Sequence, residues 1–284
     1  MNMNLFKYIK GDKVIWTVVL LLSLLSILVV YSSVVALAYR YKNGDTGSYL
    51  IKHVCIVASG IFLMYWVHKT KHSFFSRISQ IAIFLAAPLL LYTLLKGVSA
   101  GDASRWLAIP GTSLTFQTSD FAKLALITYV ARMLSIKQNV IKDFKEAFLP
   151  IVAPVIIICA LILPANFSTA ALLFLTCLVL MFIGRVNAKH LLLLIGLGIV
   201  FAGILIVMIF NFPTIVKRGE TWKARIENFK SGDSESNFQA EQAKIAIAQG
   251  GVLGKGPGNS MQRNFLPQAS SDFIFAIVIE EWGL

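Results

Sequence analysis

The feature that most constrains this 284-residue chain is a series of long apolar segments. Seven of them run at about 14–38, 51–67, 79–96, 119–134, 149–164, 169–184 and 190–211. A helix needs roughly 20 mainly apolar residues to cross the hydrocarbon core of a bilayer. Only 14% of the residues are charged, whereas an ordinary soluble domain has about 25%. The sequence therefore predicts an all-α polytopic membrane protein, and it excludes a soluble globular enzyme and a disordered chain.

The first apolar segment and the basic residues indicate the topology. The segment is longer than the core of a signal peptide, and further spans follow it, so we expect an uncleaved first helix. If the N-terminus is cytoplasmic, the inside segments hold twelve Lys and Arg residues and the short outside loops hold four. Because cytoplasmic loops collect these residues, we predict a multi-pass protein of the cytoplasmic (inner) membrane with its N-terminus inside.

Residues 212–272 then form a large extracytoplasmic loop. Within it, 221–230 and 239–249 have the pattern of amphipathic helices that lie on a membrane surface, and 231–237 is expected to be a polar turn. An eighth span starts at Phe273, but the chain that follows reaches only ~18 Å into a core of ~30 Å. We therefore expect residues 1–284 to be a single transmembrane domain that is truncated at its C-terminus.

The net charge of +12 has two explanations. It follows from the basic cytoplasmic loops, or it attracts an anionic lipid or substrate. A basic stripe with interleaved aromatic residues is missing, so we expect no nucleic-acid partner. The three cysteines are isolated and the four histidines lack metal-ligand spacing, so we predict neither a disulfide framework nor a metal-binding motif.

The glycine-rich run 250–260 (GGVLGKGPGNS) contains Lys255 and invites comparison with a phosphate-binding loop. A Walker loop needs Ser or Thr directly after the lysine, whereas Gly256 follows here. We therefore favour a re-entrant or close-packed turn in which glycine lets the backbone approach a neighbour.

Three acidic residues near the C-terminus are candidates for function. Asp272, at the start of the eighth span, is either a helix N-cap or a catalytic carboxylate. Its position alone favours the cap. Glu280 and Glu281 lie deeper, where a carboxylate costs about 2.5–3.5 kcal/mol on insertion scales. They are expected to form an internal ion pair, to line a water-filled cavity or to mark the end of the helix.

A second cluster surrounds the start of the fourth span. Thr118 or Ser119 is expected to cap this helix, with Asp120 in its first turn and Lys123 at the spacing that permits an ion pair. The pair is either a structural surface contact or part of an anion pocket formed by Arg105, Lys123 and the helix N-terminus.

Together these motifs resemble those of the SEDS family (shape, elongation, division and sporulation proteins), most of all its division-type members. The family pattern Arg-Trp, then Phe-Gln-Pro-Ser-Glu-x-x-Lys, corresponds to residues 105–106 and 116–120 with Lys123. Its Gln-x-x-Gln before a glycine run corresponds to Gln239, Gln242 and 250–260. Its Leu-Pro-Glu-x-x-x-Asp-Phe-Ile-Phe and Glu-Glu-x-Gly signatures correspond to 266–275 and 280–283.

The chain departs from the family pattern in three places. Thr118 replaces a proline and Asp120 replaces a glutamate. Gln268 replaces the glutamate of the Leu-Pro-Glu motif. Asn166, in the turn between the fifth and sixth spans, replaces an aspartate. The amide keeps the size and one acceptor, but it cannot carry charge, so it supplies neither a base nor a charged metal ligand.

The resemblance implies a peptidoglycan glycosyltransferase that polymerises lipid II, the undecaprenyl-pyrophosphate-linked substrate, at the division septum. It makes Asp272 the general base, with Arg105, Asp120, Lys123, Gln239, Gln242 and Lys255 around the substrate. Glu280, Glu281 and Asn166 are further candidates. Arg105, Lys123 or a divalent cation (Mg²⁺ or Mn²⁺) would neutralise the leaving pyrophosphate. The implied partners are a class B penicillin-binding transpeptidase and other divisome proteins, and the family usually has ten spans.

Two alternatives stay open at this point. The chain could be an elongation-type polymerase of the same family, although Gly258, Asn259 and Ser260 favour the division type. It could also be a lipid II flippase or another transporter, for which carboxylates within the membrane would suit a transport path. Transporters often contain inverted repeats, and no internal repeat is evident in the sequence.

Overall fold

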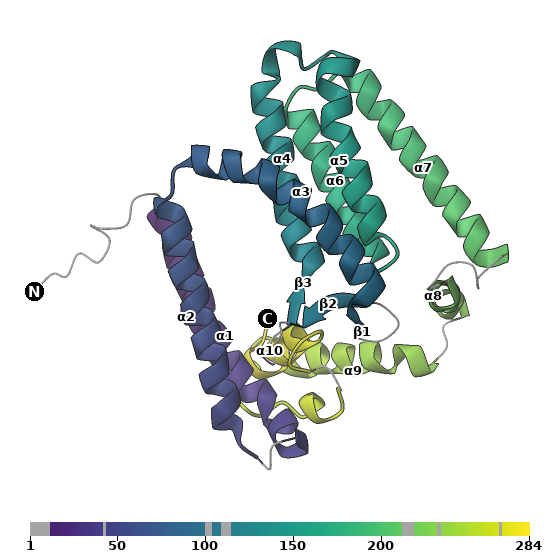
Figure 1. Cartoon of the computed structure of the whole chain (residues 1–284). Helices are drawn as coiled ribbons and strands as arrows, with labels where there is room; N and C mark the ends of the chain where they lie inside the picture. The colour runs from purple at the N-terminus through teal and green to yellow at the C-terminus, as the bar shows by residue number, and fades with distance from the viewer. Residues whose placement is uncertain are drawn as a thin grey trace, which may run out of the picture. The chain divides into compact units, whose positions relative to one another are not determined.

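The computed structural model describes residues 12–41, 44–99, 104–108, 115–211, 219–231, 234–266 and 269–284 (Figure 1). The chain forms two compact units, one of Met1–Lys69 with Ser231–Leu284 and the other of Thr70–Lys230. A helix occupies each of the seven predicted spans: α1 (Lys13–Tyr41), α2 (Thr46–Lys69), α3 (His72–Lys96), α4 (Thr118–Ile136), α5 (Leu149–Ile162), α6 (Phe167–Ile183) and α7 (Ala188–Asn211).

The helical segments long and apolar enough to cross a membrane confirm the polytopic fold. Among the described residues five qualify: Lys13–Val35, Thr46–Lys69, His72–Lys96, Phe144–Ile162 and Ala188–Asn211. The fourth of these joins α5 to a preceding π-helical turn, η3 (Phe144–Phe148). The backbone N–H groups of Lys145 and Glu146 donate to the Asp143 side chain, which caps this turn and sets the start of the span.

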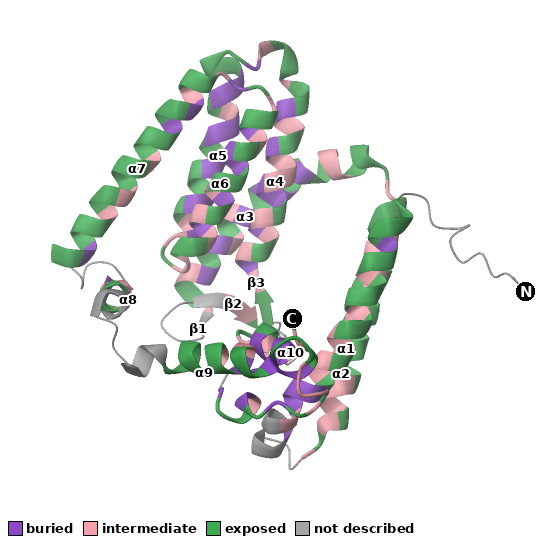
Figure 2. Ribbon diagram, turned by 180° about the vertical axis from the view of Figure 1, so that it is seen from behind, coloured by how far each residue is buried: buried purple, intermediate pink, exposed green. Residues whose placement is uncertain are grey.

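The unit of residues 70–230 is built around a bundle of α3, α4, α5 and α6. Figure 2 shows the buried positions concentrated on these helices, whereas α7 is exposed along most of its length. Leu126, Ile151, Ile158 and Met181 are among the fully buried side chains of this core. A short 3-10 turn, η2 (Gln138–Val140), leads from α4 toward η3.

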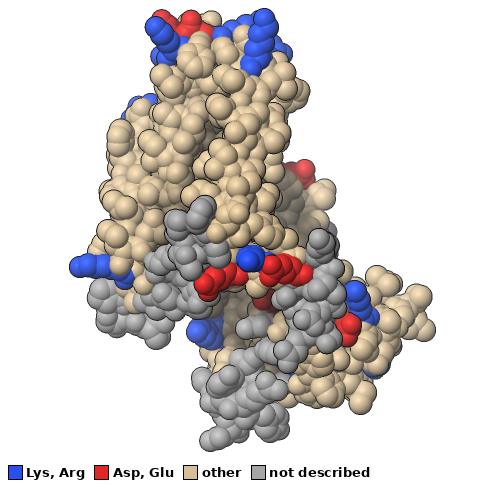
Figure 3. Space-filling model, turned by 90° about the vertical axis from the view of Figure 1, so that its right-hand side faces the viewer, with Lys and Arg blue, Asp and Glu red and all other residues tan. Residues whose placement is uncertain are grey.

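Basic side chains gather at the end of this bundle where α4 leads to α5, and beyond them an uncharged surface covers most of the bundle length (Figure 3). Lys142, Lys145, Arg185 and Lys189 are exposed in the connections at this end. Such a charged end beside an apolar band is the pattern of a bundle whose sides face lipid.

A small antiparallel sheet precedes α4, and the all-α prediction missed it. Its strands β1 (Val98–Ser99), β2 (Ser104–Ala108) and β3 (Thr115–Gln117) pair in that order. Trp106 on the central strand lies opposite Val98 on one side and Gln117 on the other. Strands β1 and β3 are too short to show an alternating pattern, and the β2 sequence SRWLA does not alternate polar and apolar residues, so periodicity could not have revealed them.

The two helices predicted within the 212–272 loop form as α8 (Gly219–Ser231) and α9 (Ser234–Gly250), and their position on a membrane surface stays a prediction. On α8, Trp222 contacts Phe167 at the start of α6, with 5.8 Å between ring centroids. The expected polar turn at 231–237 is wrong, because α9 already begins at Ser234. Serine is common at helix starts as well as in turns, and an acidic residue at the next position of the sequence favours a helix start.

The unit that contains both chain ends combines α1 and α2 with α9, the 3-10 turn η4 (Gln262–Asn264) and α10 (Ile274–Trp282). Inside the spans, Ser26 Oγ of α1 lies 3.0 Å from His53 Nε2 of α2. The eighth apolar segment is helical as expected, and its helix starts one residue after Phe273.

Candidate functional site

The carboxylate of Asp272 is exposed in the turn that precedes α10. The expected helix cap is wrong: Phe273 occupies the N-cap position, and no side chain caps the helix there. The cause is local, because the turn through residues 269–273 delays the first helical residue to Ile274. Within the described part of the chain, the Asp272 carboxylate takes part in no hydrogen bond or ion pair. It is available to a solvent molecule or a substrate.

The two glutamates of α10 are buried, with 0% of Glu280 and 2% of Glu281 exposed. Lys255 Nζ lies 2.8 Å from Glu280 Oε1, so the internal ion pair is confirmed. Ser32 Oγ of α1 donates to Glu281 Oε1 at 2.5 Å, and Arg263 Nη1 donates to the Ser32 backbone carbonyl at 3.2 Å. Glu281 is therefore tied to α1 and Glu280 to the glycine-rich run.

The glycine-rich run is a close-packed turn, as the failed match to a Walker loop predicted. The backbone N–H groups of Lys255 and Gly256 donate to the carbonyls of Glu280 and Glu281 at the end of α10. A Cβ at Gly254 would lie 2.3 Å from the carbonyl oxygen of Glu281. Glycine is required here because the two backbones meet without room for a side chain.

Three of the expected substrate-binding residues lie in this unit. Lys255 is engaged inside the protein, by Glu280 and by the side-chain oxygen of Gln249. Gln239 is exposed on α9 and Gln242 is half-buried one turn further on. Gln268, where the family has a glutamate, lies outside the described residues.

At the start of α4, Lys123 Nζ lies 2.6 Å from Asp120 Oδ1, so the predicted ion pair forms. The expected cap by Thr118 or Ser119 is wrong, because Gln117 is the N-cap residue and its side chain makes no cap hydrogen bond. Gln117 instead donates from Nε2 to Ser119 Oγ at 2.9 Å. The backbone of Arg105 belongs to β2, and its side chain lies outside the described part of the structure.

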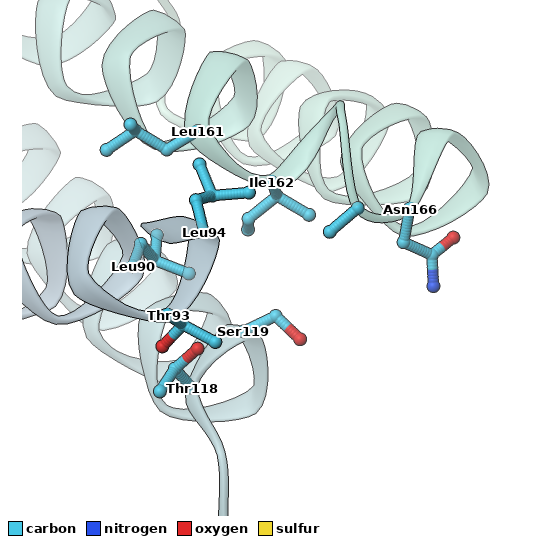
Figure 4. Close-up of a pocket in the computed structure, with 9 residues that line it drawn as sticks. Leu90, Thr93, Leu94, Thr118, Ser119, Leu161, Ile162 and Asn166 are labelled. Carbon is cyan, nitrogen blue, oxygen red and sulfur yellow. The ribbon is translucent and has the colours of Figure 1, made fainter. Parts of the chain in front are cut away.

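A hollow beside the start of α4 contains the first two residues of that helix. It is small and open to solvent, and is lined by Leu90, Thr93, Leu94, Thr118, Ser119, Leu161, Ile162, Ala165 and Asn166. Figure 4 shows apolar side chains of α3 and α5 on one side of the hollow and Thr118 and Ser119 on the other, with the Ser119 hydroxyl pointing away from the apolar side chains. An apolar wall beside hydroxyls and a helix N-terminus suits a ligand with both apolar and polar parts.

Asn166 has a structural role at the edge of this hollow. Its Oδ1 accepts a hydrogen bond from the backbone N–H of Thr169 at 3.2 Å, which caps α6. Asn and Asp cap helices about equally well, so the amide keeps the cap that an aspartate would provide.

The sequence did not predict the further partners of the two buried glutamates, which are the hydroxyls of Ser32 and Ser260 and the backbone N–H groups of Met261 and Gln262. Ser32 and Ser33 interrupt an otherwise apolar span, and this polar pair was the available signal. For metal binding, the described residues contain no group of three or more His, Cys, Asp or Glu side chains.

The fold and these motifs define a polytopic helical membrane protein with an exposed carboxylate between a glycine-rich turn and a short apolar helix. The model of the FtsW/RodA/SpoVE family, described as cell cycle proteins, matches residues 12–284. The chain belongs to this family, which confirms the resemblance found in the sequence.

Similar proteins cover nearly the whole chain. Stage V sporulation protein E of Bacillus subtilis (strain 168) is 28% identical over 280 residues, covering 96% of this chain and 73% of that protein. The probable peptidoglycan glycosyltransferase FtsW of Saccharophagus degradans is 30% identical over 274 residues, covering 94% of this chain and 67% of that protein. The protein of the same name from Bacillus subtilis is 30% identical over 281 residues, with 95% and 68% covered.

A solved structure shares the fold. It is described as "Structural coordination of polymerization and crosslinking by a peptidoglycan synthase complex". The TM-score is 0.64 at 17% identity, and the match covers 98% of this chain and 73% of the other. At this identity the similarity supports the fold alone. Any inference about chemistry rests on the residues described above.

Proposed function

We propose that this chain is a peptidoglycan glycosyltransferase that polymerises lipid II into glycan strands at the outer face of the cytoplasmic membrane. Two of the relatives described above are named peptidoglycan glycosyltransferases. The observation that carries the proposal is the exposed Asp272, which leaves the helix cap to Phe273 and keeps its carboxylate open to a substrate.

In the proposed reaction, the 4-hydroxyl oxygen of the acceptor sugar attacks the anomeric carbon of the growing glycan. The bond from that carbon to the lipid pyrophosphate breaks, and the pyrophosphate leaves with the electron pair. Asp272 takes the hydroxyl proton as the new glycosidic bond forms. The charge that develops on the pyrophosphate needs cationic groups, for which Arg105 and Lys123 are the candidates, alone or with Mg²⁺ or Mn²⁺.

The hollow at the start of α4 fits the same proposal. Hydroxyl and backbone N–H groups at a helix N-terminus bind phosphate or sugar oxygens, and the leucines beside them suit a lipid chain. We propose that Ser119, which is half-buried, contacts the polar part of a lipid-linked sugar, and that Gln239 and Gln242 contact substrate from α9.

Family membership also supports a proposal about the setting of the reaction. We propose that the N-terminus is cytoplasmic and that the protein is located at the division septum. There it would work together with a class B penicillin-binding transpeptidase and other divisome proteins. The FtsW names of several relatives support the division role. An elongation-type polymerase is the alternative within the family. A transporter is less well supported, because Glu280 and Glu281 are held by internal partners rather than lining a water-filled path.

The decisive test compares the Asp272→Asn variant with the wild type in lipid II polymerisation, using the full-length protein with its cognate transpeptidase. Asparagine preserves the size of the side chain and removes the base. Positioned acid–base groups contribute about 10²–10⁴-fold, so turnover should fall within that range while expression and thermal stability stay near wild type. Polymer formation at the wild-type rate would exclude Asp272 as the base.

A further inference from the structure

The buried carboxylate of Glu280 uses its whole hydrogen-bonding capacity within the chain. Its Oε1 accepts from Lys255 Nζ at 2.8 Å and from the Met261 backbone N–H at 3.2 Å. Its Oε2 accepts from Ser260 Oγ at 2.5 Å and from the Gln262 backbone N–H at 3.3 Å. A carboxylate has about four acceptor sites, so none is left for a substrate.

Stability alone does not account for a charge at this position. Replacing a buried ion pair by apolar side chains of similar volume is often neutral or stabilising. The Glu280 carboxylate instead fixes the conformation of the chain around it. All four of its hydrogen-bond donors, including the lysine of the ion pair, come from one short stretch, residues 255–262. The carboxylate holds that stretch against α10 in one conformation.

The stretch held by Glu280 leads directly to Asp272. We call the described residues of this segment, 260–266 and 269–273, the arch. Ser260 Oγ also accepts from the Arg263 backbone N–H, so the serine that binds Glu280 supports η4 as well. Further along, Leu266 and Ala269 pack against Ile277 of α10.

The far end of the arch is fixed by α10 itself. The backbone N–H groups of Ala276 and Ile277 both donate to the Phe273 carbonyl. Both ends of the arch are therefore attached to α10, at Ser260 and at Phe273. Asp272 directly precedes Phe273. The first attachment depends on Glu280.

We propose that Glu280 is a positioning residue for Asp272, and that Lys255 keeps its carboxylate charged and in place. The proposal rests on the proposed function, in which Asp272 is the base. It assigns Lys255 to the support of the arch instead of to the substrate. The backbone supports the same contact, because the N–H groups of Lys255 and Gly256 donate to the carbonyls of Glu280 and Glu281.

The first experiment substitutes Glu280→Gln in the full chain. Glutamine keeps the shape and one acceptor oxygen, but its NH₂ group faces two donors, so about half of the hydrogen bonds are lost. We expect hydrogen–deuterium exchange at Met261 and Gln262 to rise at least about tenfold, while exchange in α4–α6 stays unchanged. In lipid II polymerisation, kcat should fall at least about tenfold and KM should stay within about twofold. Glu241→Gln, an exposed carboxylate on α9, is the matched control and should change neither measurement.

The second variant, Lys255→Met, separates the two roles of the lysine. A positioning role predicts a lower kcat with faster exchange at Met261, whereas a substrate-binding lysine predicts a higher KM with unchanged exchange. Should Glu280→Gln fail to fold, Ser260→Ala removes one of the four hydrogen bonds to Glu280, together with the one from the Arg263 backbone N–H, and should give the same pattern at smaller amplitude.

Unchanged exchange in the arch, or faster exchange with wild-type kcat, would overturn the positioning role. Failure of the proposed function has a different signature, namely wild-type polymerisation by Asp272→Asn. In that case the exchange data for Glu280→Gln still decide whether this carboxylate holds the arch.

Discussion

Lys123 Nζ lies 2.6 Å from Asp120 Oδ1, one turn apart on α4. Both side chains are substantially exposed, at 37% for Lys123 and 56% for Asp120. Exposed pairs of this kind contribute about 0–1 kcal/mol to stability, because solvent screens the charges. The pair is therefore too weak to be needed for folding, and a large effect of Lys123 on activity would report on the substrate.

We expect Lys123→Met to lower lipid II polymerisation at least about tenfold and to change the free energy of unfolding by less than about 1 kcal/mol. The physical reason is the loss of a cation near the leaving pyrophosphate. Initial rates and denaturant unfolding of the purified protein provide the two measurements. Lys142→Met, an exposed lysine at the other end of the bundle, is the control. Wild-type rates in Lys123→Met would leave this lysine as a surface partner of Asp120.

The cap of α6 gives a prediction about stability. Asn166→Ala should lower the free energy of unfolding by about 0.5–2 kcal/mol, because the N–H of Thr169 loses its acceptor. Asn166→Asp should stay close to the wild type, since aspartate caps equally well. Chemical unfolding in detergent measures both variants. Ser168→Ala, at an exposed neighbouring position, serves as the reference, and an Asn166→Ala variant as stable as the wild type would contradict the cap.

Two glycines of the glycine-rich run allow the cost of backbone strain to be measured apart from the cost of steric contact. Gly254 and Gly258 both have positive φ, at 71° and 81°. A Cβ at Gly258 meets nothing within 4 Å, whereas one at Gly254 meets the backbone of α10. Gly258→Ala should cost about 1–2 kcal/mol from φ alone. Gly254→Ala should cost about 1–3 kcal/mol more, as overpacking does. Thermal unfolding of the two variants side by side tests the difference, and equal costs would show that the contact yields easily.

The topology can be tested by cysteine labelling in a variant that lacks Cys55, Cys159 and Cys177. A cysteine at position 234 should react with an impermeant reagent in intact cells, because we place the 212–272 loop outside. A cysteine at position 142 should react only after the cells are permeabilised. The reverse pattern would invert the predicted orientation.

Much of the fold could be predicted from the sequence, because the length and hydropathy that a membrane span needs are properties of each segment by itself. A span needs a run of apolar residues of a given length, and that requirement is met within each segment on its own. The same holds for the Asp120–Lys123 pair, whose spacing on one helix already brings the two side chains together. The sequence likewise predicted helices at α8 and α9, although α9 begins at Ser234 instead of at residue 239.

The helix caps show where local inference fails. Asp272, Thr118 and Ser119 are all of residue types that favour the cap position, yet the helices begin at positions that leave Phe273 and Gln117 as caps. Composition specifies which residues are able to cap a helix. The turn or strand that leads into the helix decides which residue arrives at the cap position.

By itself, the sequence determined the class of protein, the order of its spans and the motifs of its family. Only the tertiary structure decided what the buried charges do. Glu280 and Lys255 are separated by 25 residues, and Ser32 and Glu281 by 249, so no periodic pattern relates them. A buried carboxylate needs hydrogen-bond donors, because leaving it unpaired costs several kcal/mol. Folding can supply these donors from distant parts of the sequence. That long-range requirement turns an apparent phosphate-loop lysine into the internal partner of a glutamate on α10.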